Sequence, residues 1–259
     1  MIQLKSQREI EVMERGGHIL AETVALMERS VRPGISTQEL DKIADDFIRS
    51  HNGAVPSFKG LYNFPSSICT SINNEIVHGI PSKRRVLAEG DIVSVDVGVK
   101  YGGYHTDSAT TVAVGEVSDE SRRLLAVTRL ALQAGVDAAR NGNHLGDIGA
   151  AVQGVVEKEG FSVVRDLVGH GIGTGFHEEP QVPNYGKPNR GLRLVPGLTI
   201  AIEPMVNIGR PNIRTMPDRW TIVTVDGSRS AHFEHTVAIT ENGPRILTSL
   251  SPKPDQLVA

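Results

Sequence analysis

The sequence predicts a fold of helices and strands that occurs twice along the chain. Two helical patterns precede strand patterns within roughly residues 1–115, and the same order returns within roughly residues 116–250. Four short segments of the first part match segments of the second part in the same order. One such match is weak, but four in a constant order indicate a duplicated fold. We therefore expect a single domain over residues 1–259 with two similar halves related by a pseudo-twofold axis.

Helix signals occur at corresponding places in the two halves. Ser6 and Ser36 each stand three residues before a glutamate, which is the pattern of a capping box at a helix start. The spacing of apolar residues predicts helices over about 7–28, 37–49, 119–139 and 145–158. Beyond residue 160, short apolar runs between Gly and Pro residues indicate strands joined by turns.

A predicted hairpin in the first half carries two acidic residues. Valines alternate with polar residues over 93–99, which is typical of a half-buried strand, and Gly102-Gly103 indicate a tight turn after it. With a two-residue turn, residue 96 lies opposite residue 109, so Asp107 is one diagonal step from Asp96 on the same face. Carboxylates this close repel each other unless a cation lies between them or one keeps its proton.

The repeat supplies a second acidic pair. "LAEGDIVSVDV" matches "LVPGLTIAIEP", so Asp96 corresponds to Glu203. "YHTDSATTVAV" matches "AHFEHTVAIT", so Asp107 corresponds to Glu234. The matching segments "IVHGIP" and "VGHGIG" give each half one histidine, His78 and His170. A solvated acidic face on an edge hairpin would not require acids at equivalent places in both halves.

Four converging carboxylates require positive charge, because burying unpaired charge is costly. Two divalent cations would balance them. The donors are mainly oxygens with one or two imidazoles and no thiolate, which favours Mn, Fe, Co or Zn at a catalytic site over a structural zinc site. Two metal ions that share carboxylate ligands activate a water molecule for hydrolysis. The sequence thus predicts a dinuclear hydrolytic centre.

Composition narrows the classes of function further. The net charge is −3 and 22% of residues are charged, so the chain lacks the basic footprint of a nucleic-acid-binding protein. Cys69 is the only cysteine, which excludes disulfides and thiolate metal clusters within one chain and favours a reducing compartment. No apolar run reaches the length of a membrane span, and "MIQLKSQREIEVMERGG" lacks the apolar core of a signal peptide. We expect a cytoplasmic protein.

The motifs "HGIGTGFHEEP", "IEPM" and "FEHTVAIT", together with the Asp96–Asp107 hairpin, resemble those of the type I methionine aminopeptidases over essentially the whole chain. The resemblance implies the duplicated α+β "pita-bread" fold, with antiparallel sheets and helices packed on their outer face. It also implies a dinuclear site in which Asp107 and Glu234 bridge the metals. The full ligand set that it implies is Asp96, Asp107, His170, Glu203 and Glu234.

The same resemblance implies roles for three side chains in catalysis. Glu203 would shuttle a proton from the attacking water to the leaving nitrogen, as a general acid–base. His177 would hydrogen-bond the substrate carbonyl and stabilise the oxyanion together with the metals. His78 would contact the amide nitrogen next to the scissile bond. His105 and His232 match each other across the repeat, and a packing or supporting role suffices for both.

The methionine pocket that the resemblance implies is apolar and aromatic, with His78 at its edge. Its members would be Tyr62, Phe64, Cys69, Phe176 and Trp220. The chain departs from the common family pattern at Phe58, Phe64 and His232, where cysteine, tyrosine and glutamine are frequent. The interval between Glu203 and Glu234 is too short for the helical insertion of type II enzymes, and one cysteine cannot form the zinc-binding extension of eukaryotic type I enzymes.

The expected function is removal of the initiator methionine from nascent polypeptides with a free amino terminus, with preference for a small second residue. The enzyme would be a monomer that contacts the ribosome transiently and does not bind nucleic acid or membrane directly. Two alternatives remain open. One is a proline-specific relative, aminopeptidase P or prolidase, and the other is a binding protein on the same fold that has lost catalysis.

Overall fold

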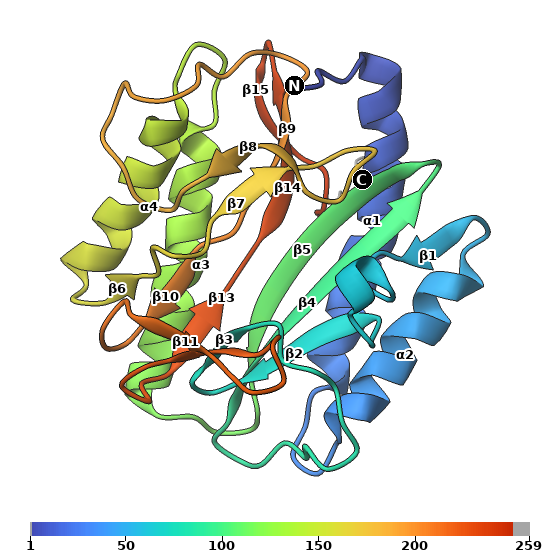
Figure 1. The fold of residues 1–259 in the computed structure, drawn as a ribbon, viewed down its shortest axis with the longest axis vertical. Coiled ribbons are helices and arrows are strands. Elements are labelled where there is room, and N and C mark those ends of the chain that lie inside the picture. The colour runs from blue at the N-terminus through green and yellow to red at the C-terminus, as the bar shows by residue number, and fades with distance from the viewer. Residues whose placement is uncertain (1, 251–259) are drawn as a thin grey trace, which may run out of the picture.

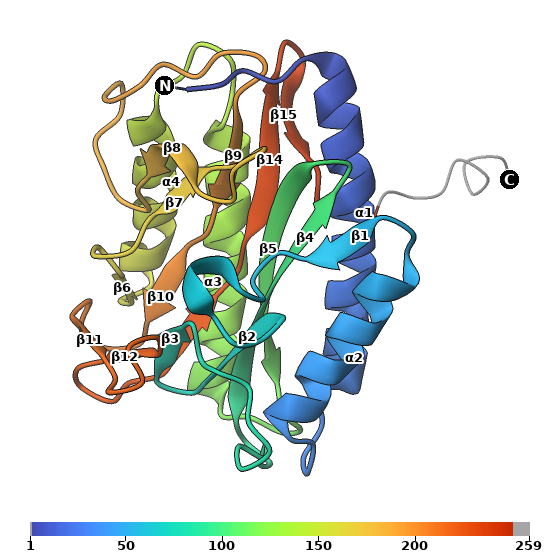
Figure 2. The same cartoon turned by 45° about the vertical axis from the view of Figure 1, so that its right-hand side comes forward.

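Two pairs of helices flank a central group of strands (Figures 1 and 2). The computed structural model describes residues 2–250. The first half consists of α1 (Gln7–Ser30), α2 (Thr37–Ser50), β1 (Ala54–Pro56), a 3-10 helix (Leu61–Asn63), β2 (Ile68–Ile72), β3 (Glu75–Val77), β4 (Ile92–Tyr101) and β5 (Tyr104–Ala113). Both predicted helices are confirmed within two residues, and each begins at its serine capping box.

The second half repeats this order with shorter strands. Its helices, α3 (Asp119–Ala138) and α4 (Leu145–Lys158), agree with the predicted ranges. Ten strands follow: β6 (Ser162–Val163), β7 (Gly169–Gly171), β8 (Glu178–Val182), β9 (Thr199–Ile202), β10 (Met205–Asn207), β11 (Ile213–Thr215), β12 (Ile222–Thr224), β13 (Ser230–His232), β14 (His235–Thr240) and β15 (Gly243–Ile246). No helix in the described part of the chain has both the length and the apolar character that crossing a bilayer requires.

Each half builds its own apolar core between its helix pair and its strands. The four valines of β4 are fully buried and pack with Leu20 of α1 and Leu40 of α2. In the second half, residues of α3 and α4 such as Leu124 and Ile148 pack with Ile200 of β9. The helices therefore cover one face of each set of strands, as the α+β prediction requires, and leave the other faces directed toward each other.

The opposite face of β4 is buried as well, so the expectation of a half-buried strand was wrong. Ser94 is 2% exposed and Asp96 is 8% exposed. Alternation predicts which residues share a face, but it does not predict what covers that face. Here the polar face of β4 is covered by residues of both halves, such as Phe58 and Phe176 over Gly98, and Asp96 on this face is withdrawn from bulk water.

The register of the first hairpin is the one predicted from its glycine turn. Tyr101 pairs with Tyr104 across the turn, Asp96 lies opposite Ala109, and Asp107 lies opposite Gly98. The second half differs, because its two long arms are each interrupted by two residues. Met205 pairs with His232 and Ile202 pairs with His235, so Glu203 and Glu234 stand in the two facing breaks.

Two threonine hydroxyls join the halves where β5 meets β13 and β14. The Thr236 hydroxyl accepts a hydrogen bond from the Asp107 N–H (2.9 Å) and donates to the Asp107 carbonyl (2.8 Å). The Thr111 hydroxyl bonds in the same way to the N–H and carbonyl of His232, both at 2.8 Å. Each hydroxyl thus takes the place of a strand partner and fixes the backbone beside an acidic side chain.

Replacing Thr236 by valine should lower the free energy of unfolding by about 2–4 kcal/mol, because the buried N–H and carbonyl of Asp107 lose their partner. Urea unfolding monitored by circular dichroism would measure the change. Thr215→Val, at an exposed position of β11, is the matched control and should change stability little. Equal effects of the two substitutions would show that the Thr236 link does not hold the halves together.

Candidate active site

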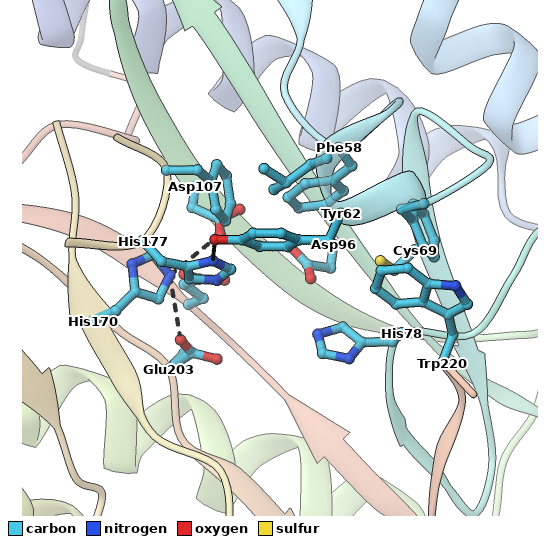
Figure 3. A pocket seen from close by; sticks show the side chains of 14 residues that line it. Phe58, Tyr62, Cys69, His78, Asp96, Asp107, His170, His177, Glu203 and Trp220 are labelled. Atoms are coloured by element: carbon cyan, nitrogen blue, oxygen red, sulfur yellow. Dashed lines mark hydrogen bonds and ion pairs between the residues drawn. The ribbon is translucent and has the colours of Figure 1, made fainter. Parts of the chain in front are cut away.

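One cavity between the two halves is lined by every residue that the sequence nominated for catalysis, metal binding or the methionine pocket. Its volume is about 130 Å³. Figure 3 shows Cys69, His78 and Trp220 on one side of it and Asp107, His170 and Glu203 on the other. The lining residues are Phe58, Leu61, Tyr62, Phe64, Cys69, His78, Asp96, Asp107, His170, Phe176, His177, Glu203, Trp220 and Glu234.

The four acids reach the cavity from both halves. Asp96 and Asp107 project from adjacent strands of the first hairpin, and Glu203 and Glu234 come from the breaks after β9 and after β13. The break at Glu203 is followed by Pro204, which has no N–H to give to a strand ladder. Glu234 keeps its backbone tied to the first half, because its N–H donates to the Ala109 carbonyl at 2.9 Å.

Burial raises the pKa of three of these carboxyl groups well above the usual range. Repulsion adds to burial in each case: from Asp107 for Asp96, from Glu203 for Asp107, and from Asp107 for Glu234. One carboxylate oxygen of Asp96 and one of Glu234 have no hydrogen-bond partner among the described residues. The protein alone therefore leaves negative charge in this cluster uncompensated.

His170 presents a free nitrogen to the acids. Its Nδ1 lies 2.8 Å from the carbonyl oxygen of Gly171. A carbonyl only accepts, so Nδ1 carries the hydrogen and Nε2 has an unshared electron pair. Nε2 stands 3.8 Å from an oxygen of Asp107 and 3.8 Å from an oxygen of Glu203. A histidine oriented by a backbone carbonyl in this way is the usual arrangement of a metal ligand.

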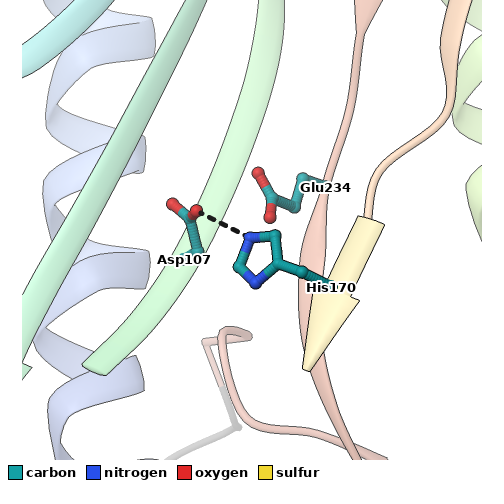
Figure 4. A group of neighbouring side chains, drawn as sticks. All are labelled: Asp107, His170 and Glu234. Carbon is teal, nitrogen blue, oxygen red and sulfur yellow. Dashed lines mark ion pairs between the residues drawn. The ribbon is translucent and has the colours of Figure 1, made fainter. Parts of the chain in front are cut away.

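Two groups of donor atoms are close enough to share an ion, with all atoms of a group within 4.8 Å of one another. The first is Asp107, His170 and Glu234, shown in Figure 4. The second is Glu203, His232 and Glu234. Glu234 belongs to both groups, and Asp96 belongs to neither although it lines the same cavity.

The two other predicted histidines lie at the cavity but outside both groups. His177 is exposed, its ring stacks on Tyr62 at 12°, and its Nδ1 is 3.3 Å from the Tyr62 hydroxyl. Desolvation of the ring where it packs on Tyr62 and Phe176 lowers the pKa of His177 to about 4, and repulsion from the protonated form of His170 adds to this shift. Burial also lowers the pKa of His78, which has a backbone φ of 61°. Both rings are therefore neutral at neutral pH and can donate one N–H.

The apolar part of the cavity is formed by aromatic rings packed edge to face. Phe58 lies 5.3 Å from Phe176 between ring centroids, and Phe64 lies 5.0 Å from Trp220. The pairing of β3 with β12 brings the segment of His78 next to that of Trp220. A cavity of about 150 Å³ accommodates a group the size of benzene, so this one admits a single side chain of moderate size.

Sequence reasoning missed two lining residues, Phe58 and Leu61. Phe58 was noted only as a departure from the family pattern. The glycine at position 98, inside a predicted strand, was a signal that another group approaches the backbone there. In the structure, a Cβ added at Gly98 would lie 2.9 Å from the Phe58 ring, so the glycine makes room for that ring. Tyr62, which was expected in the pocket, lines the cavity although it is 65% exposed.

His105 and His232, which correspond across the repeat, have different surroundings. Nδ1 of His105 is 2.9 Å from the Ser57 hydroxyl, and its ring packs edge to face on Phe176. The supporting role expected for His105 agrees with these contacts. His232 is buried, and neither of its ring nitrogens has a hydrogen-bond partner among the described residues.

The donor set fits divalent cations. Carboxylate oxygens and imidazole nitrogens suit Mn, Fe, Co and Zn, and the unpartnered oxygens of Asp96 and Glu234 require positive charge. A cluster of this kind, at the end of an apolar cavity between two matching halves, defines a metal-dependent hydrolase. The chain belongs to metallopeptidase family M24, whose model matches residues 11–241.

Comparisons with individual proteins confirm the resemblance drawn from the sequence. A methionine aminopeptidase of Clostridium acetobutylicum is 53% identical over 248 residues, which cover 96% of this chain and 99% of that protein. A crystal structure of methionine aminopeptidase from Thermotoga maritima superposes with a TM-score of 0.95 at 44% identity and covers 96% of this chain and 100% of that one. A prolidase from Pyrococcus horikoshii shares the fold, with a TM-score of 0.77 at 22% identity, 96% of this chain and 64% of that one being covered.

Asp96→Asn should stabilise the metal-free protein at pH 8 and not at pH 4. The pKa of Asp96 is raised in the folded chain. The contribution of this group to the free energy of unfolding is therefore complete below its pKa in the unfolded chain, about 4, and is lost as the pH rises through its pKa in the folded chain. Relief of even about 1 kcal/mol raises Tm by about 2–4 °C in a protein of this size. Thermal unfolding of chelator-treated protein at both pH values measures the difference.

The matched control for this experiment is Asp137→Asn, at an exposed position on α3. It should leave Tm almost unchanged at either pH. A fall in Tm for Asp96→Asn at pH 8 would mean that the acid cluster is not under repulsion in the metal-free protein.

Proposed function

We propose that this protein removes the N-terminal methionine from polypeptides, as a methionine aminopeptidase that prefers a small second residue. The observation that carries the proposal is the placing of a carboxylate–imidazole cluster at one end of an apolar cavity of about 130 Å³. That volume suits one unbranched apolar side chain, and the cluster beside it supplies hydrolytic chemistry. The names of the relatives with 45–53% identity support the same activity.

The proposed centre holds two divalent ions, with Mn, Fe, Co or Zn as the candidates. Asp96, Asp107, His170, Glu203 and Glu234 are the proposed ligands. The membership of Glu234 in both donor groups supports a bridging role for it. Both halves contribute ligands, so we propose that residues 1–259 act as one catalytic domain. When bound, two such metal ions supply a water molecule of lowered pKa as the nucleophile.

The side chains around that nucleophile divide the remaining tasks. Glu203 is only partly buried, unlike Glu234, so its carboxylate has room to take a proton from water and deliver it to the leaving nitrogen. The neutral ring of His177 donates an N–H to the developing oxyanion, and Tyr62 positions that ring. His78, at the edge of the cavity beside Trp220, contacts the peptide nitrogen that follows the methionine.

The apolar wall accounts for the choice of the first residue. Phe64, Phe176 and Trp220 present aromatic faces and edges, with which a thioether sulfur makes favourable contacts. A free amino terminus is required, because an uncapped amine would offer its lone pair to an ion held by the acid cluster, and an acylated nitrogen would not. The substrates would be new polypeptides, met in a reducing cytoplasm by a monomer in transient contact with the ribosome.

A peptide panel tests the proposed activity. Metal-free protein should be inactive, and Mn²⁺, Co²⁺ or Fe²⁺ should restore cleavage of Met-Ala and Met-Gly peptides. A peptide with norleucine in place of methionine should still be cleaved. Its loss of transition-state binding free energy should stay within about 1–3 kcal/mol, the effect of one methylene in a hydrophobic pocket. Met-Lys and Ala-Pro peptides should be poor substrates. An N-acetylated Met-Ala peptide should be resistant. Measured kcat/KM values favouring Ala-Pro would indicate a proline-specific enzyme instead.

His177→Ala should lower kcat by roughly 100-fold, the loss usual for one oxyanion donor, with metal content unchanged. Tyr62→Phe, which keeps the ring stack and removes the hydroxyl beside His177, should lower kcat much less. Steady-state kinetics with Met-Ala peptides and metal analysis of both variants give the two readouts. Loss of bound metal from His177→Ala would place that ring among the ligands and overturn the role assigned to it.

A further inference from the structure

His232 stands in the wall of the acid cluster with unused binding capacity. Its side chain is 2% exposed, and both ring nitrogens lack hydrogen-bond partners among the described residues. A buried polar group without a hydrogen-bond partner destabilises the folded protein. Its backbone is fixed, because the Thr111 hydroxyl bonds both the N–H and the carbonyl of His232. The backbone of His232 is therefore fixed, while its buried ring has no hydrogen-bond partner among the described residues.

The distances around Nε2 suit a shared ion better than a hydrogen bond. Nε2 lies 3.5 Å from an oxygen of Glu203 and 3.8 Å from an oxygen of Glu234. Hydrogen bonds from nitrogen to oxygen are about 2.7–3.2 Å long. Two donors each about 2.1 Å from one metal ion are at most about 4.2 Å apart. His170 stands at nearly the same separation, 3.8 Å, from its two carboxylates.

Comparison with the corresponding residue of the first half indicates that this arrangement is specific to His232. His105 occupies the matching position of the repeat, but its Nδ1 contacts the Ser57 hydroxyl, and its ring lies against Phe176. The repeat alone would give both histidines the same surroundings. Only the second copy lies with two carboxylates in a potential ion-binding group, Glu203, His232 and Glu234.

We propose that Nε2 of His232 is a direct ligand of the metal ion held between Glu203 and Glu234. This inference rests on the proposed dinuclear centre and adds a sixth ligand and a second imidazole to it. Coordination would leave one ring nitrogen unpartnered instead of two. It would also raise the number of imidazole donors in the centre to two, His170 and His232, which favours Co, Fe or Zn over Mn.

X-ray absorption at the cobalt edge tests the proposal on the unmodified protein. Metal-free protein is loaded with two equivalents of Co²⁺, and the imidazole scattering per cobalt ion is measured. We expect one imidazole for each bound cobalt ion, which falls to one for every two ions in His232→Gln. The second cobalt ion should also bind at least about 10-fold more weakly to that variant in calorimetric titration.

His105→Gln is the matched control, and it should keep both the imidazole signal and the cobalt affinity of the wild type. One imidazole for every two ions in the wild-type protein would overturn the proposal while leaving the dinuclear centre intact. Failure of the wild-type protein to bind two cobalt ions would overturn the dinuclear centre itself and this inference with it. The wild-type spectrum decides the question even if His232→Gln does not fold.

Discussion

Repulsion among buried carboxylates is the constraint on which the rest of the structure depends. Asp96, Asp107 and Glu234 are all withdrawn from water. This desolvation is the main cause of their raised pKa values, and repulsion from neighbouring carboxylates is the second. An apolar core alone would not hold such groups together. The Thr111 and Thr236 hydroxyls bond backbone groups at His232 and Asp107, so the strands keep their spacing whether or not the charges are balanced. The site is held by its backbone, and its charge is left for cations to neutralise.

The two halves use the same plan with different rigidity. The first hairpin is continuous from Ile92 to Ala113 apart from its turn, and it fixes its acids one diagonal step apart. In the second half, Pro204 follows Glu203 and the strand breaks there. The Glu203 side chain is 13% exposed, against 1% for Glu234. This difference supports the roles proposed for the two residues, because a carboxylate that moves protons needs access to water and freedom to turn, while one that bridges two ions needs neither.

Local signals in the sequence predicted what depends on local structure. Capping boxes gave the starts of α1 and α2, and the glycine turn gave the register that sets Asp96 opposite Ala109. The order of the repeat identified which acids converge. The burial of both faces of β4, the wall formed by Phe58, and the isolation of the His232 ring were not predictable in this way. Each of these depends on how the halves meet, and no alternation or spacing within one segment records that.

The proposed specificity would reside in a smaller part of the chain than the fold does. A prolidase shares the fold at 22% identity, and a fold by itself does not identify a substrate. In this chain the cavity wall comes from residues 58–69, Phe176 and Trp220, which lie in loops, a 3-10 helix and a short strand around the hairpin. Gly98 is where the two parts meet, because a side chain there would strike the rings of both Phe58 and Phe176. A glycine in the strand that carries Asp96 thus allows the aromatic wall to approach the acid cluster. A substrate whose apolar first side chain lies against this wall would therefore have its peptide bond beside the carboxylates.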